Sequence, residues 1–82
     1  MALITIDIRT ESPLYVKVWD RSIERHIAGP VLLNGSMSVE RISPNSLYGV
    51  YGEINFDVSE DDAHYRRLPT VTVETGGEYL VE

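Results

Sequence analysis

The chain has 82 residues, with 13 acidic and 7 basic side chains, a formal net charge of −6 and no cysteine. This length predicts a single globular domain over residues 1–82 with a small core. Without cysteine, the chain has neither a disulfide framework nor a cysteine-based zinc site. The acidic balance argues against nucleic-acid binding, because the phosphate backbone attracts basic surfaces.

The N-terminal stretch has no basic region followed by a long apolar one, and no run of about 20 apolar residues occurs. We therefore expect a soluble protein made without a signal peptide, cytoplasmic or virion-associated and not bound to a membrane.

Two stretches near the N-terminus alternate apolar and polar side chains with the period of a β-strand. Their apolar positions are Ile4, Ile6 and Ile8, then Leu14, Val16 and Val18. Residues 11–13, Glu-Ser-Pro, predict a turn between the two strands. If the apolar side chains of the second strand face the core, then Tyr15, Lys17 and Trp19 face outward.

Residues 20–30 allow two predictions. Asp20 can cap a short helical turn that carries Ile23 and Ile27 at i, i+4 and ends at Gly29-Pro30. The alternative continues the chain as a strand.

Two dipeptides predict tight hairpin turns, because Asn-Gly and Gly-Gly readily adopt the positive φ angles that such turns require. They are Asn34-Gly35, between residues 31–33 and 37–39, and Gly76-Gly77, between residues 71–74 and 79–81. The second turn would place Val73 opposite Leu80.

Between these two turns, residues 43–46 predict a loop, and the glycines of residues 48–52 predict a bulge or a close backbone contact. Ile54, Phe56 and Val58 then alternate with polar side chains, which predicts a third half-buried strand.

The segment SEDDAHYRRLP, residues 59–69, is the densest run of charged side chains. It predicts a short helix: Ser59 caps it, the acids occupy its N-terminal end, the arginines occupy its C-terminal end, and Pro69 stops it. A charged loop is the first alternative, and a metal or acid/base site at Asp61 and His64 is the second. The spacing of Asp57, Ser59 and Asp61 resembles a calcium loop, but the required glycine and the final glutamate are missing.

These elements predict a mainly β fold, a small antiparallel sandwich or barrel with one or two short helical turns. The alternative is an α+β fold with the helices on one face of an antiparallel sheet. The chain lacks a phosphate-binding loop, a nucleophile elbow and a metalloprotease helix motif, so we expect no enzyme, cofactor or metal, and no small-molecule ligand.

The function we predict is a small non-catalytic protein-binding or structural module, self-associating as a homo-oligomer or forming a subunit of a larger assembly such as a viral structural or accessory protein. Its interface candidates are Tyr15, Lys17, Trp19, Tyr48, Tyr51 and Tyr79. One alternative is an acidic inhibitor that occupies a basic site on another protein. Its acidic patch candidates are Asp57, Glu60, Asp61 and Asp62. Another alternative is carbohydrate binding through Trp19 and the tyrosines.

Overall fold

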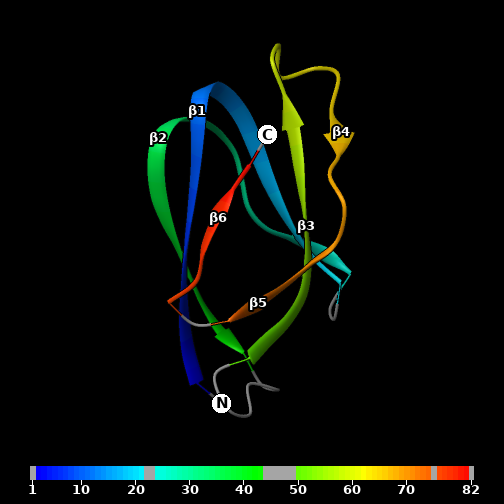
Figure 1. The fold of residues 1–82 in the computed structure, drawn as a ribbon. Coiled ribbons are helices and arrows are strands. Elements are labelled where there is room, and N and C mark those ends of the chain that lie inside the picture. The colour runs from blue at the N-terminus through cyan, green and yellow to red at the C-terminus, as the bar shows by residue number, and fades with distance from the viewer. Residues whose placement is uncertain (1, 22–23, 44–49, 75, 82) are drawn as a thin grey trace.

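The computed structural model describes residues 2–21, 24–43, 50–74 and 76–81, which contain strands and no helix. The strands are β1 (Ala2–Asp20), β2 (Arg25–Ser43), β3 (Val50–Ser59), β4 (Arg66–Arg67), β5 (Val71–Glu74) and β6 (Glu78–Leu80) (Figure 1). All pairings are antiparallel except that of β6 with β1. The predicted mainly β class is confirmed, and the α+β alternative is wrong for the described part of the chain.

Both predicted helical turns are wrong. β2 begins at Arg25, so the strand alternative holds from residue 25 onward. Residues 22–23, which include Ile23 of the predicted turn, lie outside the described residues. Residues 60–64 form bends rather than a helix. Asp62 has a φ of 60°, in the left-handed region that a right-handed helix does not contain, so this segment forms a loop and not a helical turn.

β1 and β2 form one long hairpin that is bent in the middle. In its register Thr10 lies opposite Gly35 and Leu14 opposite Leu33, so residues 11–13 face only Asn34. The two predicted turns therefore fall at the same place and are both wrong: they bend the paired strands without reversing the chain. The positive φ of Gly35, 99°, is used in this bulge.

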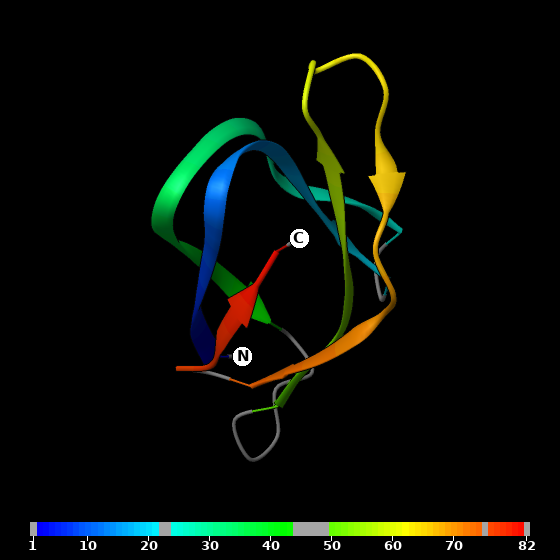
Figure 2. The ribbon, with the colours of Figure 1, turned by 45° about the horizontal axis from the view of Figure 1, so that its top comes forward.

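The bend gives the two halves of β1 different neighbours. Residues 7–9 pair with β6, whereas residues 15–20 pair with β3. β3 in turn pairs with β5 along its first half and with β4 along its second half. The sheet therefore curls around its core but does not close into a barrel, since no ladder joins β6 to β4 or β5 in the described chain (Figure 2).

The core consists of the apolar side chains that the strands turn inward. The predicted stripes supply most of it: Ile6, Ile8, Leu14, Val16, Val18, Ile54, Phe56 and Val58 are all buried. The predicted irregularity before the third strand is confirmed at Gly52, where the register with β5 shifts and φ is 130°. The predicted loop at residues 43–46 lies outside the described residues after Ser43.

The predicted last hairpin is wrong, because β5 and β6 pair with different strands. The Gly77 N–H donates to the Glu74 carbonyl at 3.0 Å, and the Gly76 N–H donates to the Thr5 carbonyl at 2.7 Å. This crossing connection carries the chain from β3 to β1. As a result Val73 is buried while Leu80 is 47% exposed, so the two residues do not form the predicted pair.

Candidate interaction surface

The outer face of the sheet formed by β1, β2, β3 and β4 carries the best-defined group of polar and aromatic side chains. The structure places Tyr15, Lys17 and Trp19 on this face, alternating with the buried residues of β1, as predicted. Trp19 lies opposite His26 of β2, and Lys17 lies opposite Asp57 of β3. Lys17 and Asp57 are far apart in the sequence, so only the fold brings them together, whereas Trp19 and His26 are close in the sequence because β2 follows β1 directly.

Asp57 is the centre of this face and is buried, with 7% of its surface exposed. Arg67 of β4 donates from Nε to Oδ1 at 2.8 Å and from Nη2 to Oδ2 at 3.0 Å, and His26 Nε2 lies 3.0 Å from Oδ2. The hydrogen bonds from Arg67 hold the pKa of the Asp57 carboxyl below its usual value, although burial opposes this shift. Asp57 is therefore part of an ion-pair network and does not belong to an exposed acidic patch.

The rings of Trp19 and Tyr65 are each contacted by a cationic or imidazole group. The Trp19 ring meets the His26 ring edge-on, with centroids 4.9 Å apart, and the Arg67 guanidinium carbon lies 4.9 Å from the Trp19 ring centroid. Lys17 Nζ lies 4.0 Å from the Tyr65 ring centroid. These contacts cover part of each ring and fix the side chains in one arrangement.

Asn55 is the second buried polar group on this face. Its amide nitrogen donates to the Leu68 carbonyl at 3.2 Å and to Thr70 Oγ1 at 3.0 Å, while its oxygen accepts from Arg21 Nη1 at 3.2 Å. These bonds hold the segment after β4 against β3. We therefore assign Asn55 a structural role.

Leu32 is the residue of this face that the sequence did not reveal. Its side chain is 54% exposed, and it lies directly across from Tyr15 in the β1–β2 ladder. In the run Val31-Leu32-Leu33, apolar residues occupy both faces of the strand, so alternation could not distinguish the exposed one. Its pairing with the outward Tyr15 would have done so, but that register depends on the bend at residues 11–13.

Tyr79 is the remaining interface candidate whose side chain the structure describes. Tyr79 is half-buried: its ring centroid lies 6.3 Å from that of Phe56, and its hydroxyl accepts a hydrogen bond from the Glu74 N–H at 2.9 Å. Tyr79 therefore packs against the core and is not on the outer face. Tyr48 and the side chain of Tyr51 lie outside the described residues.

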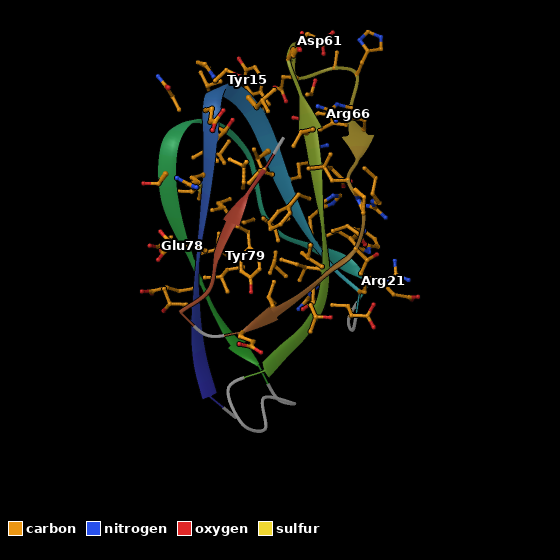
Figure 3. All side chains as sticks on the ribbon, in the orientation of Figure 1. Tyr15, Arg21, Asp61, Arg66, Glu78 and Tyr79 are labelled. Atoms are coloured by element: carbon orange, nitrogen blue, oxygen red, sulfur yellow. The ribbon has the colours of Figure 1, made fainter. Side chains whose placement is uncertain are left out.

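The other acidic candidates, Glu60, Asp61 and Asp62, lie in the exposed loop between β3 and β4, with Asp61 at one end of the molecule (Figure 3). Asp61 accepts hydrogen bonds from the N–H groups of Ala63 and His64, both at 2.9 Å, and from Ser59 Oγ at 2.8 Å.

His64 Nδ1 lies 2.7 Å from Asp61 Oδ2. Hydrogen bonds from the backbone and side chain of His64 lower the pKa of the Asp61 carboxyl, and the Asp61 carboxylate raises the pKa of His64. Asp61 and His64 are thus in contact at i, i+3, and a loop rather than a helix brings them together.

The Tyr65 hydroxyl donates to the Asp62 carboxylate. Desolvation and this bond raise the pKa of Tyr65 to about 12. The side chains of Asp61 and Asp62 are therefore both bonded to other groups of the same loop. Among the described residues, no group of three histidine, aspartate or glutamate side chains is placed to hold a metal ion.

Comparisons with protein-family models, curated proteins and solved structures give no match to this chain. No helix in the described part of the chain is long and apolar enough to cross a membrane. The function must therefore be argued from the geometry of the described residues.

Proposed function

We propose that this chain is a non-catalytic protein-binding module that self-associates through the outer face and the free edge of β2. The observation that carries the proposal is the exposed Leu32 beside Tyr15, on the strand that ends the sheet. An unpaired strand edge can pair with the edge of a second copy, and such pairing would cover the exposed apolar side chain beside it.

The edge of β2 suits a symmetric contact. β2 is 19 residues long and lies at the margin of the sheet (Figure 1), and no described strand pairs with its outer side. An antiparallel pairing of β2 with β2 of a second copy about a twofold axis would satisfy both edges at once. The register of β2 with β1 is continuous at positions 31–33 and 35–43, which are separated by the bend at Asn34 and preceded by the interruption at Gly29 and Pro30.

The charges on the outer face also favour self-association. Although the chain carries a net charge of −6, Arg67 pairs with Asp57, and Lys17 adds a cation beside the aromatic side chains. Two such faces, brought side by side by pairing of their β2 strands, therefore meet without a concentration of like negative charge.

The alternative functions receive less support from the geometry. The acidic candidates do not form a single face: Asp57 is buried, residues 60–62 lie in the β3–β4 loop, and Glu53 lies near the other end of β3. Carbohydrate stacking on Trp19 would compete with the Arg67 and His26 contacts to its ring. Cytoplasmic or virion location and membership of a larger assembly remain part of our proposal.

Sedimentation velocity over a concentration series tests this proposal. We expect a reversible dimer for the wild type and a monomer for Leu32→Lys, because a charge at this position opposes apolar contact. Leu80→Lys is a matched control, because Leu80 is also an exposed leucine but lies on β6, away from β2. A wild type that stays monomeric throughout, or equal weakening by both substitutions, would contradict the proposal.

A further inference from the structure

A second surface lies on the open side of the curled sheet, where β6 faces the segment after β4 (Figure 2). The groove there has a volume of about 350 Å³. Its lining is formed by Phe56, Leu68, Pro69, Val71, Glu78, Tyr79 and Leu80. All of these side chains except Glu78 are apolar or aromatic. Leu80 is 47% exposed, whereas Phe56 belongs to the core.

One edge of β6 is bonded to β1, and the backbone groups of the other edge are available for hydrogen bonds. The Gly77 carbonyl accepts from the Asp7 N–H at 2.9 Å, and the Val81 N–H donates to the Arg9 carbonyl at 2.8 Å. The backbone N–H and C=O groups of successive strand residues point to alternate edges, so those of Glu78 and Leu80 point to the edge away from β1. In the described chain, no strand pairs with β6 on that side. A free strand edge therefore borders an apolar groove.

The side chains of β6 specify which extended segment would fit. Tyr79 is half-buried against the core, whereas Glu78 and Leu80 are exposed and, because strand residues alternate, project to the opposite face of the strand. An added strand would place its inward side chains beside Tyr79 and over Phe56, where apolar groups fit. Its outward side chain next to Glu78 would be favoured if it were basic, because opposite charges on neighbouring strands attract.

We propose that this groove binds an extended segment of another protein, which adds as a strand to the free edge of β6 and alternates apolar inward residues with lysine or arginine beside Glu78. Pairing with a strand edge supplies main-chain hydrogen bonds, while pockets for alternate side chains supply specificity. A second copy of this chain does not fit this pattern. Its own Val16-Lys17-Val18 run is already paired on both sides, by β2 and β3.

Fluorescence anisotropy with the labelled peptide acetyl-Lys-Val-Lys-Val-Lys-Val-amide tests the proposal. We expect saturable binding to the wild type, at least tenfold weaker binding to Leu80→Lys, and a preference of Glu78→Lys for the matching peptide in which glutamate replaces lysine. Leu32→Lys and Glu40→Lys are controls on exposed positions of β2, and both should bind the lysine peptide like the wild type.

Two further peptides separate strand addition from attraction of any cation to an acidic protein. The peptide acetyl-Lys-Lys-Lys-Val-Val-Val-amide has the same charge but no alternation, and a version of the first peptide that is N-methylated at every residue cannot donate the main-chain hydrogen bonds of an added strand. We expect both to bind at least tenfold more weakly than the first peptide. Equal binding of all three peptides, or binding unchanged by Leu80→Lys, would overturn the proposal, as would binding of a small apolar dye in the groove with no peptide binding.

This experiment is independent of self-association, because the two exposed leucines lie on different surfaces. Loss of the dimer in Leu32→Lys with peptide binding retained, and loss of peptide binding in Leu80→Lys with the dimer retained, would support each proposal separately. Circular dichroism of both variants checks that the sheet is intact.

Discussion

Arg67 of β4 binds both carboxylate oxygens of Asp57 on β3, at 2.8 Å and 3.0 Å. β4 has only two residues, and this bidentate contact is the main polar link between its side chains and the sheet. A charge-assisted pair of this geometry is stronger than an ordinary hydrogen bond. The same pair fixes the guanidinium over Trp19, so it organises the outer face as well as the fold.

We expect Asp57→Asn to lower the free energy of unfolding by about 1–3 kcal/mol, because it leaves Arg67 and His26 without their charged partner. Urea denaturation followed by circular dichroism measures this change. Glu60→Gln is the matched control: Glu60 is an exposed acid, and its substitution should change stability by no more than about 0.5 kcal/mol. An Asp57→Asn protein as stable as the wild type would show that the pair contributes nothing.

The loss of stability in Asp57→Asn should depend on pH. The pKa of Asp57 in the folded protein lies below its ordinary value of 3.8. The contribution of Asp57 to the free energy of unfolding is therefore fully present above pH 3.8 and is lost as the pH falls through the folded pKa. The stability difference between wild type and Asp57→Asn should therefore be constant near neutral pH and shrink below pH 3.8. Denaturation curves at several acidic pH values test this expectation, and a difference that grows on acidification would contradict it.

His64 should titrate above its ordinary value of 6.5, because the Asp61 carboxylate accepts a hydrogen bond from its ring and favours the protonated form. The imidazole proton resonances measured by NMR against pH give this pKa directly. In Asp61→Asn the charge is removed, and we expect the pKa to return toward 6.5. A His64 pKa that is the same in both proteins would show that the loop does not hold this contact in solution.

Replacement by alanine should lower the free energy of unfolding by different amounts at Gly29 and at Gly35. Both have a positive φ, 86° and 99°, but a Cβ at Gly29 would lie 2.2 Å from the Val16 carbonyl oxygen, whereas one at Gly35 would have no atom within 4 Å. Gly35→Ala should cost about 1–2 kcal/mol from backbone conformation alone. Gly29→Ala should cost about 3 kcal/mol or more, because the β1 backbone must also move. Urea denaturation of the two variants measures the difference, and equal costs would contradict the close approach.

Self-association should strengthen as salt is added. Two chains that each carry a charge of −6 repel at long range, and this repulsion is screened as ionic strength rises from about 0.01 M to about 1 M. Sedimentation at these two ionic strengths tests the expectation. A dimer that dissociates in high salt would instead indicate an interface held by ion pairs between copies.

The alternation of apolar and polar side chains was sufficient to predict the strands and their inward faces. Whether a side chain points inward is decided by local geometry, since successive residues of a strand point to opposite faces. For that reason Val16 and Phe56 were predicted correctly as core residues, and Tyr15 and Trp19 as outward ones.

The positions where the chain reverses could not be read in the same way. Asn34-Gly35 and residues 11–13 have the composition of turns, but a bulge in a continuous strand uses the same positive φ and the same missing proline N–H. The choice depends on what lies opposite, and here each irregular segment lies opposite the other. Likewise, the strands on either side of Gly76-Gly77 pair with different partners, β5 with β3 and β6 with β1, which local composition does not specify.

By itself, the sequence determined that this protein is a β domain with Tyr15, Lys17 and Trp19 on an outer face. Only the tertiary structure decided that Asp57 is an ion-pair partner of Arg67 and not part of an acidic patch, and that Leu32 is the exposed leucine beside Tyr15. The physical reason is that strand periodicity is a property of neighbouring residues, whereas charge neutralisation and surface exposure depend on side chains that the fold brings from other strands.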